Sequence, residues 1–78
     1  MKPFNVLCIG GSDSSGGAGI QADLKAVSVC GCWGTSVITA VTAQDTGGVW
    51  GIYPVAPAFV GKQMDTVLRD IGTGVMKT

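Results

Sequence analysis

Residues 10–25 read Gly-Gly-Ser-Asp-Ser-Ser-Gly-Gly-Ala-Gly-Ile-Gln-Ala-Asp-Leu-Lys, with four polar side chains between two pairs of glycines. An apolar run, residues 4–9, precedes this stretch, and Ile20, Leu24 and Val27 follow it at helical spacing. A strand that ends in a polar glycine loop and continues as a helix is a common ligand site of α/β proteins, because glycines let the backbone approach a ligand and the helix start offers unpaired N–H groups. We therefore predict a ligand-binding loop here, in preference to an ordinary strand-to-helix turn.

Two well-known nucleotide-binding loops are excluded by the residues at their key positions. Gly11 and Gly16 have the glycine spacing of a P-loop, but Gly17 and Ala18 stand where that motif needs Lys and Ser or Thr. A dinucleotide fingerprint that began at Gly17 would have Ala22 in place of its third glycine. The loop is therefore predicted to bind a small polar molecule, not to hold the phosphates of a nucleotide.

Composition limits the chemistry that the chain can perform. The 78 residues carry five Lys or Arg and five Asp, with no His and no Glu. No basic cluster indicates nucleic acid or an anionic membrane as a partner. The absence of His and Glu excludes a histidine general base, a histidine-ligated metal site and a pair of catalytic glutamates from this sequence.

The cysteines and the first residues bear on the cellular compartment. Cys8, Cys30 and Cys32 lack the spacing of a zinc site, and Cys8 lies in the first apolar run, where we expect a buried thiol. The N-terminal apolar run is too short for a signal peptide core or a membrane span. Free thiols without a secretory signal predict a cytoplasmic protein.

The remaining elements follow from hydrophobic periodicity and from Gly and Pro positions. We predict strands over 4–9, 34–44 and 49–55, and a final strand that begins at residue 75. Helices are predicted over 18–31 and from Pro57 to Ile71, the second with an apolar stripe. The order β-α-β-β-α-β predicts an α/β fold with a mostly parallel sheet and flanking helices. Because two helices cannot cover both faces of such apolar strands, we expect residues 1–78 to be the N-terminal part of a larger domain.

Gln44 is the most informative single residue. It falls at the carboxyl end of the predicted strand 34–44, where open α/β sheets bind their ligands. Its amide offers a donor and an acceptor side by side, which suits the N–C–NH₂ edge of an aminopyrimidine. A glutamine that caps the strand end or faces solvent remains an equal alternative. Asp23 lies near the predicted helix start, where the helix dipole alone would favour a carboxylate.

Residues 8–25, residues 36–44, and Asp70-Ile71-Gly72 with Lys77-Thr78 resemble the hydroxymethylpyrimidine/phosphomethylpyrimidine kinases of thiamine biosynthesis. The resemblance covers essentially the whole chain and corresponds to the first third of those enzymes. It implies a ribokinase-like fold and transfer of phosphate from ATP to 4-amino-5-hydroxymethyl-2-methylpyrimidine and then to its monophosphate. It also implies a homodimeric parent protein.

The resemblance implies roles for five residues. Gln44 would recognise the pyrimidine edge, Gly11 and Asp23 would flank the substrate, and Ala18 and Thr42 would line the pocket. The ATP site, with its Mg²⁺, and the catalytic base would lie beyond Thr78, so no catalytic residue and no metal ligand is assigned within the chain. Gly72-Thr73-Gly74 resembles the family's anion hole, but it precedes a strand, so we do not assign it that role.

Two other functions remain open. Related kinases of pyridoxal and pyridoxine share such a glycine loop, and Gln44 is the residue that favours the pyrimidine. A non-catalytic fragment that only binds a pyrimidine or a partner is the other alternative. We expect the isolated chain to show no turnover and to fold poorly.

Overall fold

The computed structural model describes residues 4–78 as six elements in the order β-α-β-β-α-β. Their bounds are β1 Asn5–Ser12, α1 Gly19–Val29, β2 Trp33–Asp45, β3 Gly48–Pro54, α2 Pro57–Asp70 and β4 Val75–Lys77. The predicted order is therefore confirmed. The first strand runs three residues further into the glycine loop than expected, because Gly10, Gly11 and Ser12 continue to pair with β2.

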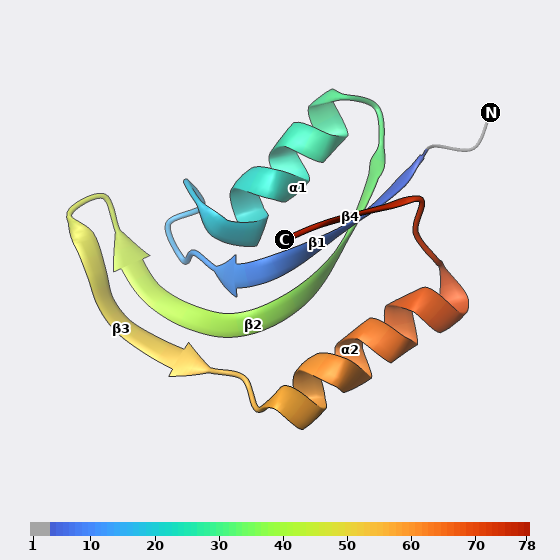
Figure 1. Ribbon diagram of the computed structural model, residues 1–78. Helices are drawn as coiled ribbons and strands as arrows, with labels where there is room; N and C mark the ends of the chain where they lie inside the picture. The colour runs from blue at the N-terminus through green and yellow to red at the C-terminus, as the bar shows by residue number, and fades with distance from the viewer. Residues whose placement is uncertain (1–3) are drawn as a thin grey trace.

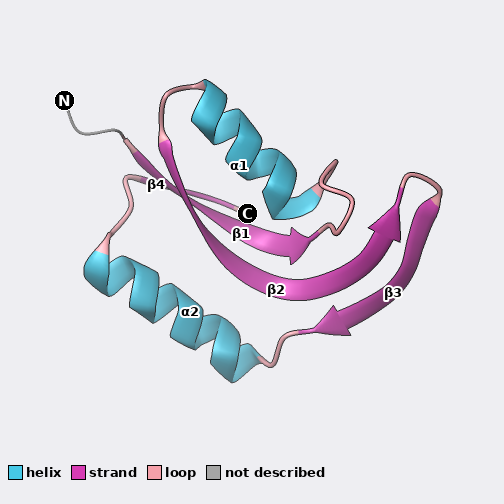
Figure 2. Cartoon of the chain, turned by 180° about the vertical axis from the view of Figure 1, so that it is seen from behind, coloured by secondary structure: helices cyan, strands magenta, loops and turns pink. Residues whose placement is uncertain are grey.

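The four strands form one sheet in the order β3-β2-β1-β4. β1 pairs in parallel with β2 and with β4, and β3 pairs antiparallel to β2 at one edge of the sheet. The chain thus crosses from β1 to β2 on one side and returns to β4 on the other side of β1. Right-handed crossovers in opposite directions put their helices on opposite faces of the sheet. Figures 1 and 2 show α1 and α2 on the two sides of the sheet.

The core is thin and is centred on the middle of β1 and β2. Leu7, Cys8 and Val37 are fully buried, and Ile20 of α1 is nearly so. Burial raises the pKa of the Cys8 thiol, with a smaller contribution in the same direction from the nearby Asp23 carboxylate. The buried thiol expected at position 8 is confirmed.

The later part of β2 differs from the prediction. The apolar run 34–44 predicts a strand that is buried throughout, but Val41 is 47% exposed. The apolar stripe predicted for the second helix is only half-buried, and Ile71 beyond its end is exposed. Val41 pairs with Tyr53 of β3, and within residues 4–78 no helix contacts β3. The one strand that α2 contacts is β2, so its apolar stripe has few partners.

The helix ends follow the predicted signals. α1 ends in a Schellman arrangement, in which Gly31 has φ +78° and the Cys32 N–H donates to the Val27 carbonyl. Pro57 opens α2, as predicted. α2 is fixed to β2 by the Gln63 amide, which accepts from the Ile38 N–H and donates to the Ile38 carbonyl, both at 2.9 Å. The side chain thus continues the strand pairing where β3 has ended.

Neither helix within residues 4–78 is long and apolar enough to cross a membrane. Cys8, Cys30 and Cys32 are all free thiols.

Candidate functional site

A hollow of about 140 Å³ lies between the glycine loop, the start of α1 and the end of β2. It is lined by Gly11, Ser12, Asp13, Gly19, Thr42 and Gln44. A bulge at Gly10/Gly11 shifts the register of β1 against β2 just before the two strands reach it. The hollow is therefore at the carboxyl ends of two parallel strands, the position predicted from the sequence.

The Asp13 carboxylate organises the loop from inside. Its Oδ1 accepts from the backbone N–H of Ser15 at 2.8 Å and from the Ser15 hydroxyl at 2.7 Å, and its Oδ2 accepts from the Ala18 N–H at 2.7 Å. The residue is only 4% exposed. The Ser15 hydroxyl, together with these N–H groups and that of Gly17, lowers the pKa of Asp13 although burial opposes the shift. These donors are therefore bound to the loop's own carboxylate and are not available to a phosphate group, which supports the exclusion of a phosphate-binding loop.

Gly19 closes the loop onto the first strand. Its φ of +58° is one that residues with a side chain rarely adopt. A Cβ at this position would also collide with the Gly11 carbonyl oxygen. Only glycine allows α1 to begin this close to the end of β1, so the pocket wall depends on this residue.

The end of β2 is fastened to the loop by two hydroxyls. Ser14 Oγ accepts from the Gln44 N–H and donates to the Gln44 carbonyl, both at 2.7 Å. Thr42 Oγ1 donates to the Ser12 carbonyl at 2.8 Å and is 3.3 Å from Gln44 Oε1. These contacts fix the backbone at Gln44 and hold the residue at the hollow.

The structure brings three of the five predicted site residues together. Gly11, Thr42 and Gln44 line the hollow. Ala18 precedes α1, with its N–H on Asp13. Asp23 lies in the second turn of α1, not at its start, and forms an ion pair of 2.7 Å with Lys77 of β4. The explanation of Asp23 by the helix dipole is therefore replaced by this ion pair.

Sequence reasoning did not single out Ser12, Asp13 and Gly19 as residues lining the hollow. All three lie in the stretch 10–25, from which the loop itself was predicted. That stretch does not show which of its side chains point into the hollow and which form hydrogen bonds within the loop. Lys77 was not singled out as a site residue either, because its contact with Asp23 joins β4 to α1 and follows from no local pattern.

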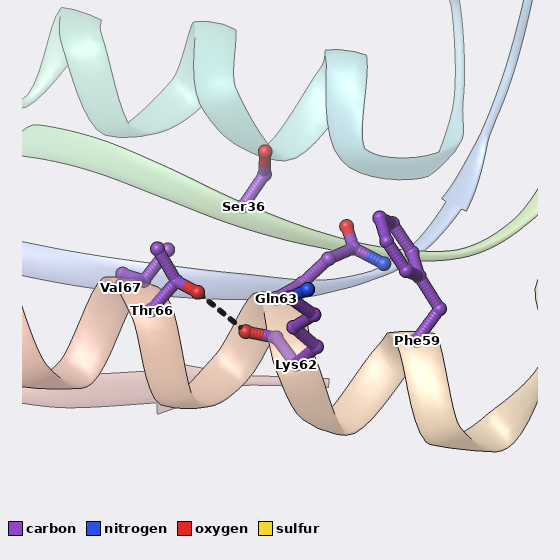
Figure 3. Close-up of a pocket in the computed structure, with 6 residues that line it drawn as sticks. All are labelled: Ser36, Phe59, Lys62, Gln63, Thr66 and Val67. Atoms are coloured by element: carbon purple, nitrogen blue, oxygen red, sulfur yellow. Dashed lines mark hydrogen bonds between the residues drawn. The ribbon is translucent and has the colours of Figure 1, made fainter.

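Larger hollows lie elsewhere and are chemically less suited to a polar ligand. One of about 320 Å³ lies between α2 and β2 and is lined by Ser36, Phe59, Lys62, Gln63, Thr66 and Val67 (Figure 3). Its Gln63 amide is used by the β2 backbone, and the Thr66 hydroxyl donates to the Lys62 carbonyl at 2.7 Å. Another, of about 340 Å³, is an exposed surface of β2 and β3 around Val41 and Ile52. We therefore place the candidate site at the smaller hollow.

Within residues 4–78, no three His, Cys, Asp or Glu side chains come together as a metal site would require. The described residues thus offer a pocket wall with hydroxyl, amide and carboxylate groups. Nothing in the lining of the hollow combines the cation and metal ligands that phosphoryl transfer uses.

Comparison with known sequences extends this description. Residues 13–78 match the family model for phosphomethylpyrimidine kinase. The hydroxymethylpyrimidine/phosphomethylpyrimidine kinase of Escherichia coli is 55% identical over 71 residues, which are 91% of this chain and 27% of that protein. The thiamine biosynthesis bifunctional protein of Geobacter sulfurreducens is 60% identical over 74 residues, 95% of this chain and 15% of that protein. The chain thus spans well under a third of the length of these relatives.

Solved structures of a phosphomethylpyrimidine kinase and of a pyridoxal kinase superimpose closely on the chain. The phosphomethylpyrimidine kinase of Clostridium difficile 630 superimposes with a TM-score of 0.90 at 49% identity, over 94% of this chain and 32% of that one. The pyridoxal kinase of Bacillus subtilis, solved as an ADP complex, superimposes with a TM-score of 0.89 at 37% identity, over 99% of this chain and 31% of that one. The predicted ribokinase-like fold is confirmed for the part of it that these residues span. On the sequence match over residues 13–78 and on this fold, the chain belongs to the phosphomethylpyrimidine kinase family.

Proposed function

We propose that this chain forms the substrate side of a kinase that transfers phosphate from ATP to 4-amino-5-hydroxymethyl-2-methylpyrimidine and then to its monophosphate. The observation that carries the proposal is the position of Gln44, at a hollow beyond the carboxyl ends of β1 and β2. The family membership and the names of the E. coli and C. difficile relatives support it.

The lining of the hollow suits a neutral aromatic ring with polar edges. Among the described residues, no lysine or arginine lines it, and Asp13 contributes a carboxylate at its wall. The Gln44 amide can pair with a ring nitrogen and an adjacent amino group at once. Gly11 and Thr42 complete the wall, and we propose that they contact the ring through backbone and methyl atoms.

Ala18 and Asp23 belong to the proposal as neighbours of the substrate. Ala18 lies one residue before Gly19, which lines the hollow, and Asp23 lies one helical turn after it. We propose that Asp23 acts near the hydroxymethyl end of the ring, with Lys77 holding its carboxylate in place through their ion pair.

The nucleotide side is proposed to come from outside these 78 residues. The chain covers 27% of the E. coli relative, and related pyridoxal kinases have been solved with ADP and with AMP-PCP. We propose that ATP, its Mg²⁺ and the catalytic base are held by the remainder of such a protein, which makes residues 1–78 part of a larger ribokinase-like domain. Phosphoryl transfer then depends on positioning the hydroxyl and stabilising charge on the transferred group.

Replacement of Gln44 by Leu tests the proposal. The matched segment of the E. coli kinase is replaced by this chain. The resulting complete enzyme, called the hybrid enzyme below, contains the residues in question. Loss of the amide pair should weaken pyrimidine binding by about 2–3 kcal/mol, or roughly 30- to 150-fold in KM. The KM for ATP should hardly change. Both constants are measured by a coupled ADP assay.

Gln63→Leu serves as the matched control, since it makes the same chemical change on the other side of β2. It removes the pairing with Ile38 and should lower the melting temperature while leaving the pyrimidine KM near that of the unmodified hybrid. An unchanged pyrimidine KM in Gln44→Leu would remove Gln44 from the site and with it the main support for the proposed substrate.

A B6-vitamer kinase is the second candidate, favoured by the close superposition on pyridoxal kinases. The Staphylococcus aureus enzyme in complex with pyridoxal superimposes with a TM-score of 0.87 at 36% identity. Turnover of the hybrid with the pyrimidine and with pyridoxal, measured side by side, decides between the two. We expect the pyrimidine to give the higher kcat/KM.

The location and assembly of the protein are proposed on the same resemblance. We propose a cytoplasmic protein, consistent with three free thiols, although the relatives in rice and Arabidopsis are chloroplastic. We also propose a homodimer for the complete kinase, which sedimentation of the hybrid tests directly.

A further inference from the structure

The hydroxyl groups around the hollow differ in the acceptors to which they donate. The Ser14 hydroxyl donates to the Gln44 carbonyl, and the Ser15 hydroxyl donates to Asp13 Oδ1. The Thr42 hydroxyl donates to the Ser12 carbonyl, the shorter of its two contacts. Since a hydroxyl has one hydrogen, none of these three has a donor left for a ligand.

Ser12 differs because a glutamine fixes which way its hydroxyl must act. The Asp13 N–H can only donate, so the Gln21 atom 2.7 Å from it is the carbonyl oxygen Oε1. The other end of that amide is then necessarily Nε2, which donates to Ser12 Oγ at 2.7 Å. Ser12 Oγ is thereby an acceptor toward Gln21, and its own hydrogen is directed elsewhere. Among residues 4–78, no protein group accepts that hydrogen.

We propose that the Ser12 hydroxyl is a substrate-contacting donor of this pocket, and that Gln21 is the positioning residue that turns the donor toward the ligand. The inference rests on the proposed function, because it takes the hollow at Gln44 as the substrate site. Ser12 lines that hollow and Gln21 does not. The ligand must therefore place a hydrogen-bond acceptor opposite Ser12.

The chemistry of that acceptor follows from the direction of the bond. A ring nitrogen with a free lone pair fits, and a ring nitrogen that carries a proton does not, because it is itself a donor. The pocket therefore selects for an azine that stays unprotonated at the working pH. Two ring contacts, one from Ser12 and one from Gln44, would fix the ring in its plane and so orient the hydroxymethyl group.

The test compares substrates that differ by one ring nitrogen. The hybrid enzyme is assayed with the pyrimidine and with its two monodeaza analogues, in which one or the other ring nitrogen is replaced by C–H. Because Ser12 and Gln44 each contact one ring nitrogen, the unmodified hybrid should bind both analogues more weakly. For the analogue that lacks the nitrogen facing Ser12, the loss should be about five- to tenfold, the cost of one neutral hydrogen bond. Ser12→Ala should bind the pyrimidine and that analogue alike, whereas Ser12→Thr, which keeps a hydroxyl, should keep the preference.

Gln21→Glu tests the positioning role with Ser12 still present. Both oxygens of the introduced carboxylate accept, so one still pairs with the Asp13 N–H while the other draws the Ser12 hydrogen away from the ligand. This variant should therefore lose the preference as Ser12→Ala does, with the KM for ATP unchanged. Ser15→Ala, which removes a hydroxyl already bound to Asp13, should keep the preference and is the control.

The outcomes separate this inference from the proposed function. Pyrimidine turnover by the unmodified hybrid with no loss of analogue discrimination in Ser12→Ala overturns the role of Ser12 and leaves the proposed function intact. Loss of discrimination in Ser12→Ala but not in Gln21→Glu overturns the role of Gln21 alone. If a folded hybrid that retains its ATP affinity neither binds nor phosphorylates the pyrimidine, the proposed function and the inference fail together.

Discussion

At the scale of single residues, Asp13 shows how one side chain can decide what a loop binds. Its carboxylate is almost completely buried and accepts hydrogen bonds from Ser15 and Ala18. Without it, the loop would present several free N–H groups in one place, the arrangement that attracts anions. With it, the loop is held closed by an internal acceptor, and the donor left over at its start is the Ser12 hydroxyl.

The lowered pKa of Asp13 predicts how stability responds to acid. A carboxyl group whose pKa is lower in the folded chain stabilises the fold fully above its ordinary pKa of about 3.9, and the contribution is lost as the pH falls through the lower folded value. Asp13→Asn should therefore reduce stability near neutral pH and make it less sensitive to pH below about 4. Urea unfolding of the hybrid enzyme between about pH 2.5 and pH 7 measures this.

Asp45 provides the comparison for that experiment. Its pKa is also lowered, chiefly by the Trp50 side chain and then by the backbone N–H of Gly47, so it contributes to the same acid limb. Because Asp45 is exposed at the end of β2, Asp45→Asn should flatten the acid limb while leaving pyrimidine KM unchanged. An acid limb that is equally steep with and without Asp13 would show that its hydrogen bonds do not contribute to folding.

At the scale of elements, the pocket exists because β1 and α1 meet in a very short space. The bulge at Gly10/Gly11, the positive φ of Gly19 and the pairing of Gln21 with Ser12 and Asp13 lie within this one junction. The junction also carries most of the hollow's wall. A change in its backbone should therefore affect stability and substrate binding together.

Gly19→Ala tests the junction. The new methyl group would need a disfavoured φ and would meet the Gly11 carbonyl oxygen, so we expect a loss of roughly 2 kcal/mol or more in the free energy of unfolding. The pyrimidine KM should rise as well. Gly61→Ala in α2 is the control. A Cβ added there would meet nothing within 4 Å, and alanine in a helix should raise the free energy of unfolding by about 0.5–1 kcal/mol. Equal stability of the two variants would contradict the role given to Gly19.

At the scale of the whole molecule, the described part of the chain is a broad, thin layer. Its principal extents are 41 × 30 × 14 Å, and its radius of gyration is 13.0 Å. A compact domain of this length would have a radius of gyration of about 11.5 Å. Large apolar side chains lie on its surface, among them Trp50, Ile52 and Tyr53 of β3 and Met76 of β4. Such surfaces are normally covered in a soluble protein.

This shape predicts the behaviour of the 78 residues in isolation. With few fully buried side chains, the chain alone should melt broadly, bind a hydrophobic dye such as ANS and show no kinase activity. The hybrid enzyme should melt cooperatively, without strong dye binding. Calorimetry and dye fluorescence on both proteins make the comparison. A sharp two-state melt of the isolated chain would show that its thin core is sufficient.

The sequence by itself determined the order and type of the elements, the place of Gln44 at the end of β2 and the position of the glycine loop. These follow from local periodicity, from glycine and proline positions, and from the resemblance carried by residues 8–25 and 36–44. Such signals lie within one element or one turn, so they can be interpreted without knowing what packs against it.

Only the tertiary structure decided which polar groups remain free for a ligand. That Asp23 pairs with Lys77, and that Ser14 is bound to Gln44 while Ser12 keeps its hydrogen, depends on contacts between residues far apart in the chain or turned together at one junction. The sequence does not show whether a hydroxyl or carboxylate has a hydrogen-bond or ion-pair partner. Its availability is decided by distance and direction in three dimensions, because hydrogen bonds need both.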